Sequence, residues 1–331
     1  MAWTWRAATA ALAASTAALV TLVDCVGDEP AFPSLDAGGD ELGASGGSDG
    51  PPAASSDSAG SGEAGVDADA DAGPPCDLSR PFGPPENVRE LNSANDDESA
   101  RLTPDELTVY FSRRNGANGA YFVYTATRST PTGPFGALTQ LALLPDPSGP
   151  SIAPDRSTLY YASDVQTDSG LPDLYAASVP FTAGTSTDLT AINSAAWDFT
   201  PYIRPDELAL YFASNRLGSD DIFVAPRVNG AFVAPTYLPK INTGANERSP
   251  VVSPDDQTLY FASDGTGNYD VYVSTRARPT DAFGAPKAVT ELDTPSVEMP
   301  DWISPDGCRM YFRSDRAGGA GGRDIWRARR P

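Results

Sequence analysis

Carboxylates recur at one position of a repeated pattern, and converging carboxylates are suited to binding chemistry. Pro-Asp pairs stand at 104–105, 154–155, 205–206, 254–255 and 305–306. The residue seven positions before each proline is acidic in four of the five copies, which gives Asp97, Asp198, Glu247 and Glu298, while the fifth position holds Pro147. If the copies close into a ring, these carboxylates would surround one point and focus a negative potential there. A cation, a basic peptide or a polyhydroxylated ligand could bind such a ring.

A structural role is the alternative for these carboxylates, because each could accept hydrogen bonds from the amides of its neighbouring loop. Trp197 and Asp301 lie beside them in the sequence, and an exposed tryptophan is suited to stacking on a sugar. We therefore expect Asp97, Asp198, Glu247, Glu298, Trp197 and Asp301 as candidate binding residues. The aspartates of the Pro-Asp pairs recur in every copy, which favours backbone capping for them over catalysis.

The composition excludes several classes of site. The 331 residues carry a formal charge of −21 and include no histidine. An acidic chain repels nucleic acids and anionic membrane surfaces, so we expect no nucleic-acid partner. The lack of histidine excludes Ser-His-Asp and Cys-His catalysis and speaks against a zinc site. We expect no metal and no cofactor.

Each copy divides into four short β segments, as the third copy shows at 200–204, 208–214, 221–227 and 232–241. The second and third segments are rich in β-branched and aromatic residues and are joined by a glycine-containing turn. The first two segments are joined by Pro-Asp, in which proline presets φ and aspartate caps the turn. No stretch keeps a helical period. Four antiparallel strands in a repeat of about 50 residues are typical of a β-propeller blade.

The copies resemble the TolB-type propeller repeat of bacterial envelope proteins. The fourth and fifth copies carry the resemblance most fully, with Glu247, Ser253-Pro254-Asp255, Leu259-Tyr260-Phe261 and Asp270-Val271-Tyr272, and with Glu298, Ser304-Pro305-Asp306, Tyr311-Phe312 and Asp324-Ile325-Trp326. The resemblance covers about three-quarters of the chain. It implies a fold and an envelope location, and it implies no activity, because propellers host many functions.

The phase of the copies predicts how the ring closes. The segment 82–92 resembles the fourth segments at 232–242 and 283–293, yet it precedes the first copy, while the fifth copy ends after its third segment. The N-terminal segment should therefore supply the outer strand of the last blade, which would cover both sheet edges. We predict an all-β, five-bladed β-propeller of four-stranded antiparallel blades over residues 80–331.

Cys76 and Cys308 fall at the same end of this predicted blade. Cys76 lies just before the closing strand, and Cys308 lies in the turn between the first and second strands of blade five. A disulfide between them fits this geometry. The alternative is a free buried Cys308 and an unpaired Cys76.

The sequence of the N-terminal quarter predicts that the protein is exported and then tethered to a membrane. Residues 1–24 have the pattern of a signal peptide, and residues 22–25 resemble a lipobox with Cys25 as the lipidated residue, although Asp24 stands where a small residue is usual. The alternative is an ordinary cleaved signal. Residues 25–79 are predicted to be a disordered linker, because the segment 26–75 holds eleven acidic residues, no lysine or arginine, and few apolar residues.

Two functional hypotheses follow. The first is a non-catalytic, monomeric binding or scaffold propeller, exported to the periplasm or outer membrane or secreted. It would engage an envelope protein or glycan through its loop face and would meet a membrane only through the lipid anchor. The second is a five-bladed glycosidase-like hydrolase that uses channel carboxylates as acid and base. The hydrolase needs acids that differ from blade to blade, whereas the recurring acids occupy equivalent positions.

Overall fold

The computed structural model describes residues 76–116, 119–164 and 171–331, and within these residues every helix-or-strand element is a β-strand. The predicted signal peptide, Cys25 and nearly all of the predicted linker lie outside the described residues. No helix in the described part of the chain is long and apolar enough to span a membrane. The all-β prediction is confirmed.

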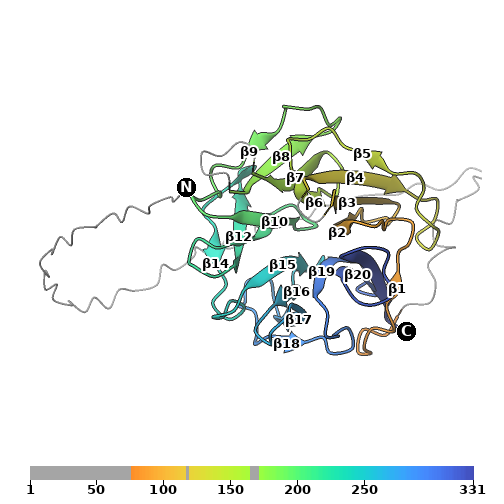
Figure 1. The fold of residues 1–331 in the computed structure, drawn as a ribbon. Helices are drawn as coiled ribbons and strands as arrows, with labels where there is room; N and C mark the ends of the chain where they lie inside the picture. Colours follow the sequence, from red (N-terminus) through yellow and green to blue (C-terminus); the bar gives the residue numbers. More distant parts are fainter. Residues whose placement is uncertain (1–75, 117–118, 165–170) are drawn as a thin grey trace, which may run out of the picture. The chain divides into compact units, whose positions relative to one another are not determined.

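The strands form five antiparallel sheets arranged as the blades of a propeller (Figure 1). Blade 1 contains β2 (Asp96–Leu102), β3 (Thr108–Arg114), β4 (Tyr121–Thr127) and β5 (Thr139–Gln140). Blade 2 contains β6 (Ser148–Ile152), β7 (Thr158–Ser163), β8 (Asp173–Ser178) and β9 (Thr187–Asp188). Blade 3 contains β10 (Asp198–Ile203), β11 (Ala209–Ser214), β12 (Asp221–Val228) and β14 (Thr236–Tyr237). The short strand β13 (Ala231–Phe232) pairs antiparallel with the C-terminal end of β12.

Blade 4 contains β15 (Glu247–Val252), β16 (Thr258–Ser263), β17 (Asp270–Thr275) and β18 (Lys287–Ala288), and blade 5 contains β19 (Glu298–Ile303), β20 (Arg309–Ser314) and β21 (Asp324–Arg329). The outermost strands are only two residues long, shorter than the segment expected at 232–241. Pro235 and Pro239 explain this in blade 3, because proline cannot donate to a sheet ladder.

The ring closes with the N-terminal segment, as predicted. Strand β1 (Glu86–Asn87) pairs antiparallel with β21, so that Asn87 lies opposite Trp326 and completes blade 5. The innermost strands β2, β6, β10, β15 and β19 contact one another in sequence, and β19 contacts β2. These five strands therefore line one central channel.

The Pro-Asp turns have the same geometry in every blade. In blade 1 the amide of Glu106 donates to the carbonyl of Thr103 at 2.8 Å, and the Asp105 carboxylate accepts from the amide of Leu107 at 3.1 Å. The residue after the aspartate has a positive φ in all five copies: Glu106, Arg156, Glu207, Asp256 and Gly307. The backbone-capping role expected for the turn aspartates is confirmed.

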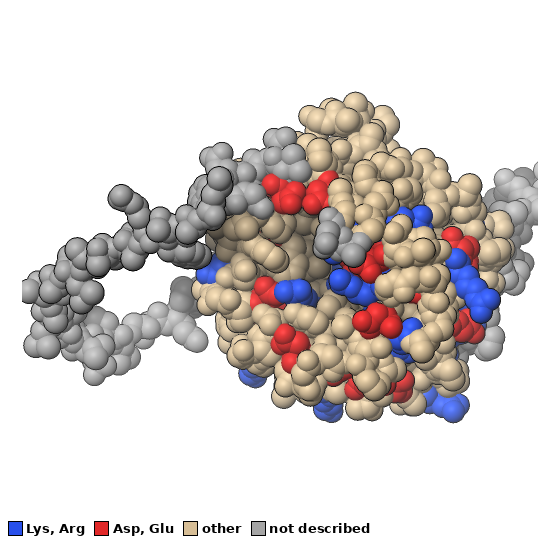
Figure 2. Space-filling model, viewed as in Figure 1, with Lys and Arg blue, Asp and Glu red and all other residues tan. Residues whose placement is uncertain are grey.

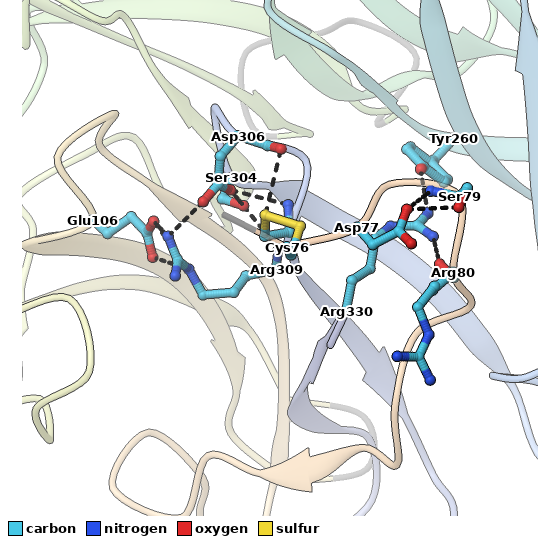
Figure 3. The surroundings of a disulfide bond; sticks show 11 residues. Cys76, Asp77, Ser79, Arg80, Glu106, Tyr260, Ser304, Asp306, Arg309 and Arg330 are labelled. Carbon is cyan, nitrogen blue, oxygen red and sulfur yellow. Dashed lines mark hydrogen bonds and ion pairs between the residues drawn. A yellow bond between two sulfur atoms is a disulfide. The ribbon is translucent and has the colours of Figure 1, made fainter. Parts of the chain in front are cut away.

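A disulfide joins Cys76 to Cys308 across 232 residues of sequence, with their Cα atoms 5.8 Å apart (Figure 3). Next to it, the amide of Asp77 donates to the carbonyl of Pro331 at 3.0 Å. The two ends of the propeller are thus held together beside the strand that closes the ring.

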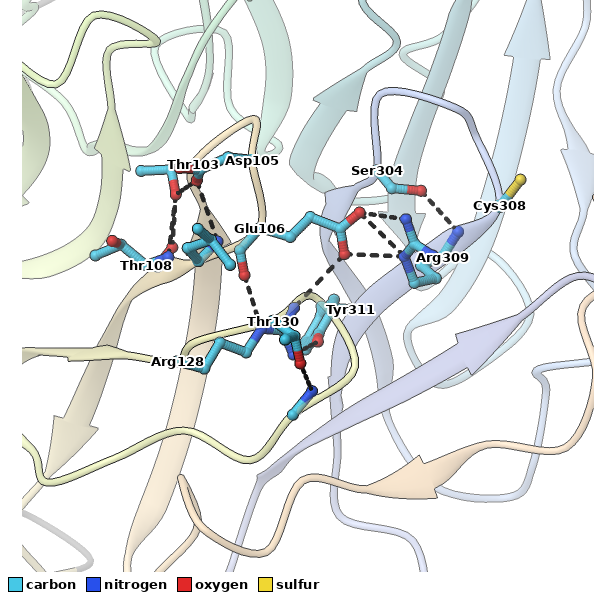
Figure 4. A network of polar contacts seen from close by, with 12 residues as sticks. Thr103, Asp105, Glu106, Thr108, Arg128, Thr130, Ser304, Cys308, Arg309 and Tyr311 are labelled. Carbon is cyan, nitrogen blue, oxygen red and sulfur yellow. Dashed lines mark hydrogen bonds and ion pairs between the residues drawn. The ribbon is translucent and has the colours of Figure 1, made fainter. Parts of the chain in front are cut away.

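An arginine at the end of the third strand joins neighbouring blades in four of five cases. Arg276 lies over the ring of Phe283 at 4.1 Å, donates to the hydroxyl of Tyr211 in the preceding blade at 3.3 Å, and pairs with Asp256 at 2.6 Å. Figure 4 shows the equivalent network in blade 1, where Arg128 reaches Tyr311 and Glu106. Blade 2 has Val179 at this position. These contacts lie between blades and contribute to the stability of the ring.

Replacing Arg276 by methionine should lower the free energy of unfolding by about 2 kcal/mol, because buried Asp256 loses one of its two arginine partners and Tyr211 loses a donor. Urea denaturation followed by tryptophan fluorescence measures the change. Arg278 is a matched control, since its side chain is 76% exposed and Arg278→Met should change stability by less than about 0.5 kcal/mol. Equal effects of the two substitutions would contradict the role given to Arg276.

Candidate functional site

The four recurring carboxylates are buried within their own blades. Asp97, Asp198, Glu247 and Glu298 are each 0% exposed. Each accepts hydrogen bonds from the amide and hydroxyl of a serine or threonine four residues earlier, as Asp97 does from Ser93 at 2.6 and 2.7 Å. Burial raises the pKa of Asp97, and hydrogen bonds from Ser93 and Arg113 oppose that rise.

Three of these carboxylates also hold an arginine from the second strand or the hairpin turn that follows it. Arg113 pairs with Asp97 at 2.5 Å, Arg216 with Asp198 at 2.5 Å and Arg316 with Glu298 at 3.0 Å. The carboxylates therefore fix the loop that leads into each innermost strand. The sequence predicts a ring of acids that faces a ligand at a mouth of the channel. In the structure the four carboxylates instead bind amides, hydroxyls and arginines beside their own strands.

Charged residues that break the repeat occupy the centre of the channel. Asp301 stands where the other blades have Ala100, Pro150, Pro201 and Pro250, and Arg313 stands where they have Ser112, Ala162, Ala213 and Ala262. Asp301 is 0% exposed and pairs with Nη1 of Arg313 at 2.5 Å. Burial raises the pKa of Asp301, and the neighbouring Arg313 and Arg101 oppose that rise.

Arg313 reaches from β20 to the innermost strands of the two neighbouring blades. Its Nη1 donates to Oγ of Ser99 in blade 1 at 3.0 Å, and its Nη2 donates to Oγ of Ser249 in blade 4 at 2.6 Å. Both serines have positive φ, 59° and 53°, at a register shift in the innermost strand. The shift directs these residues toward the channel, so one side chain of blade 5 connects three blades at their centre.

Glu98 and Arg101 are further charged residues on the innermost strand of blade 1. Glu98 is 7% exposed and pairs with Nη1 of Arg323 at 3.0 Å. Arg101 is 2% exposed and lies over the ring of Tyr202 at 4.9 Å. Burial lowers the pKa of Arg101 to about 10, with Asp301 and Tyr202 opposing that change. The centre of the ring is therefore charged on its blade 1 and blade 5 sides.

A hollow of about 250 Å³ opens where the innermost strands begin, and we call it the start mouth. Its lining includes Tyr121, Trp197, Phe199, Arg248, Arg313 and Arg323. Trp197 is 42% exposed and meets Phe199 edge-on, with ring centroids 6.4 Å apart. Arg248 lies over Phe199 at 5.3 Å and over Tyr269 at 5.1 Å, and it pairs with Asp220. Figure 2 shows charged side chains of both signs near the middle of the face in view.

Sequence reasoning placed Trp197 and Asp301 near the channel and missed Arg101, Arg248 and Arg313. The signal that could have found them is departure from the repeat, because Arg101 and Arg313 replace smaller or uncharged residues of the other copies. Within the ranges that the structure describes, no group of three or more Asp, Glu or Cys side chains is placed to hold a metal ion.

Comparison with known proteins gives similarity in fold. No protein-family model and no curated protein matches the chain. A putative TolB from Agrobacterium tumefaciens is 17% identical with a TM-score of 0.48, over 73% of this chain and 86% of that one. TolB from Acinetobacter baumannii is 18% identical with a TM-score of 0.45, over 72% of this chain and 56% of that one. A puromycin-hydrolysing peptidase from Mycobacterium tuberculosis is 12% identical with a TM-score of 0.40, over 71% of this chain and 46% of that one.

The chain thus spans little more than half of the second of these structures and less than half of the third. Likenesses of this size concern the fold, and none of them assigns an activity. The chain folds as a five-bladed β-propeller that is similar to TolB structures.

Proposed function

We propose that the protein is a non-catalytic binding propeller that is exported, held at the cell envelope, and engages an envelope protein or glycan through its start mouth. The observation that supports this most is the half-exposed Trp197, which stands beside Phe199 and Arg248 over a hollow. Tryptophan, tyrosine and arginine are the residues that most often dominate binding energy at interfaces. Tryptophan rings also stack on sugars, and arginine forks bind carboxylates.

The charges at the start mouth favour a partner that carries acidic or hydroxyl groups. Arg248, Arg313 and Arg323 line the hollow, and Glu98 is the one carboxylate among its described lining residues. Arg313 is buried against Asp301, whereas Arg248 and Arg323 pair with Asp220 and Glu98 and keep 31% and 32% of their side chains exposed to a partner. An acidic loop of a protein or a uronic-acid-containing glycan would complement these two arginines. This reverses the sign of the partner expected from the recurring carboxylates.

The arrangement of the central carboxylates supports a binding role over hydrolysis. A glycosidase needs two carboxyl groups that both reach the substrate. Asp301 is fully buried and paired with Arg313, and Glu98 is paired with Arg323. Each carboxylate is therefore already paired with an arginine of the protein.

Export is supported by the Cys76–Cys308 disulfide, because disulfides persist in oxidising compartments. Tethering rests on Cys25. In the organism of origin, the full chain should fractionate with membranes and incorporate labelled palmitate, and Cys25→Ser should abolish the label and release the protein. A Cys25→Ser protein that still fractionates with membranes would contradict lipid tethering, and it would leave the binding role of the start mouth unaffected.

Replacing Trp197 by serine should weaken partner binding by at least tenfold, because a central aromatic residue commonly contributes 2 kcal/mol or more at such sites. Quantitative capture from solubilised envelope, with increasing amounts of immobilised full chain, measures the affinity. Leu208→Ser is the matched control, since Leu208 is 56% exposed in the same blade but belongs to a Pro-Asp turn at the other end of the channel. A greater loss from Leu208→Ser would place recognition on the opposite face.

A further inference from the structure

A second cavity, of about 210 Å³, lies at the other end of the channel, where the five Pro-Asp turns meet. We call this end the proline mouth, because Pro104, Pro154, Pro205, Pro254 and Pro305 all line it. Behind the prolines the walls are mostly apolar, with Trp302, Tyr202 and the aliphatic residues Leu102, Ile152, Ile203 and Ile303. Ser151 and one charged side chain, Arg101, complete the described lining.

Arg101 has no carboxylate in direct contact within the described residues. Its Nε and Nη1 atoms are buried and have no hydrogen-bond acceptor within residues 76–116, 119–164 and 171–331, and no carboxylate of those residues lies within 4.0 Å of it. The acid whose charge acts on Arg101 is Asp301. Its Oδ1 pairs with Arg313, and its buried Oδ2 has no hydrogen-bond donor among the described residues. Among the described residues, the guanidinium of Arg101 makes one cation–π contact, with the ring of Tyr202. With a pKa of about 10, Arg101 remains a cation at neutral pH.

Arg101 is also particular to one blade. The equivalent positions hold Ser151, Tyr202, Val251 and Trp302, so the fold of a blade does not need an arginine there. Burying a cation whose donors have no hydrogen-bond acceptor is unfavourable. An anion in the adjoining cavity would offset it. Because Arg101 lines a cavity that is otherwise mostly apolar, its charge indicates a ligand with an anionic group and an apolar body.

The volume of the cavity and its single guanidinium limit the size and the charge of the ligand. An apolar protein cavity of roughly 150 Å³ takes up benzene, so about 210 Å³ accommodates an aromatic ring with one further group. Phosphate sites use several backbone amides together with cations, whereas one guanidinium with unpaired donors matches the charge of a single carboxylate. The ring of such an acid would lie among the prolines, Trp302 and Tyr202.

We propose that the proline mouth binds a small monocarboxylic acid with a flat apolar body of about the size of benzoate, and that Arg101 holds its carboxylate. This site goes beyond the proposed function, since it lies at the opposite end of the channel from Trp197. Arg313 and Asp301 are absent from the described lining of this cavity, so the two sites can be tested separately.

The test is an isothermal titration of the full chain with benzoate, benzamide and acetate. Benzoate should saturate one site, benzamide should bind at least tenfold more weakly because it lacks the charge, and acetate should bind at least tenfold more weakly because it lacks the ring. Equal affinity for benzoate and benzamide would overturn the role of Arg101. Equal affinity for benzoate and acetate would overturn the assignment of an apolar acid. So would a failure of benzoate to saturate the protein at about 10 mM, which is roughly ten times a millimolar Kd.

Arg101→Met should weaken benzoate binding at least tenfold, while the protein should keep its fold, because the change removes an unpaired charge and retains most of the side-chain volume. Arg156→Met is the matched control: Arg156 follows the Pro-Asp pair of blade 2, its side chain is 48% exposed, and it does not line the described cavity. Its benzoate affinity should stay within twofold of the original protein. If Arg101→Met binds benzoate unchanged, the proposal fails, and if that variant does not fold, the comparison of benzoate with benzamide decides.

Discussion

Replacing Arg313 by methionine should lower the free energy of unfolding by about 3–5 kcal/mol, because the substitution leaves Asp301 buried without its counterion. Arg313 is 4% exposed, and its guanidinium also holds Ser99 and Ser249 of two other blades. Methionine keeps the aliphatic stem, so the loss reports the charge and its hydrogen bonds more than lost volume. Urea denaturation of the full chain, followed by tryptophan fluorescence, measures the change.

A double-mutant cycle with Asp301 separates the loss of the Arg313–Asp301 ion pair from other destabilising effects of the Arg313 substitution. Asp301→Ala restores the kind of residue that blade 1 has at Ala100. In the double variant no carboxylate is left unpaired, so it should be about 2 kcal/mol more stable than the sum of the single effects predicts. Arg329→Met, on an exposed arginine of the same blade, should have almost no effect. Strict additivity of Arg313→Met and Asp301→Ala would contradict a direct ion pair.

Removing the Cys76–Cys308 disulfide by replacing both cysteines with serine should lower the free energy of unfolding by about 4 kcal/mol. The bond closes a loop of 232 residues, and cross-links that close long loops restrict the unfolded chain most. It also holds the segment that leads to β1, the strand that completes blade 5.

Reduction of the unaltered protein should have the same effect as the double substitution, and reductant should not change the double variant. Cys25→Ser serves as the control, because Cys25 takes no part in this bond, and its stability should match that of the original protein. Equal stability of the oxidised and reduced protein would contradict the role assigned to the disulfide.

The blade count, the strand order and the closure of the ring could be predicted because they follow from recurring local chemistry. Each Pro-Asp turn fixes one tight connection, and the misplaced fourth segment at 82–92 leaves one way to complete blade 5. The length of the outer strands could not be predicted as well, since Pro235 and Pro239 compete with the β-forming residues around them.

The role of the recurring acids could not be decided from their spacing alone. A carboxylate that caps a loop and one that faces a ligand occupy the same place in the repeat, and the difference depends on the direction of the side chain. The serine or threonine four residues before each acid, such as Ser93 before Asp97, was the local signal for capping. Arg101 and Arg313 could not be found in this way, because each occurs in one copy of the repeat and the recurring pattern gives no sign of it.

Site-specific crosslinking in cells tests the central claim, that the start mouth is the binding surface, most directly. A photoreactive amino acid would replace Trp197 in one full-length variant and Leu208 in another, since both side chains are exposed in blade 3 at opposite ends of the channel. After irradiation of intact cells, the account predicts a discrete adduct with an envelope protein or glycan from position 197 and none from position 208. An adduct from position 208 alone, or equal labelling from both positions, would contradict it.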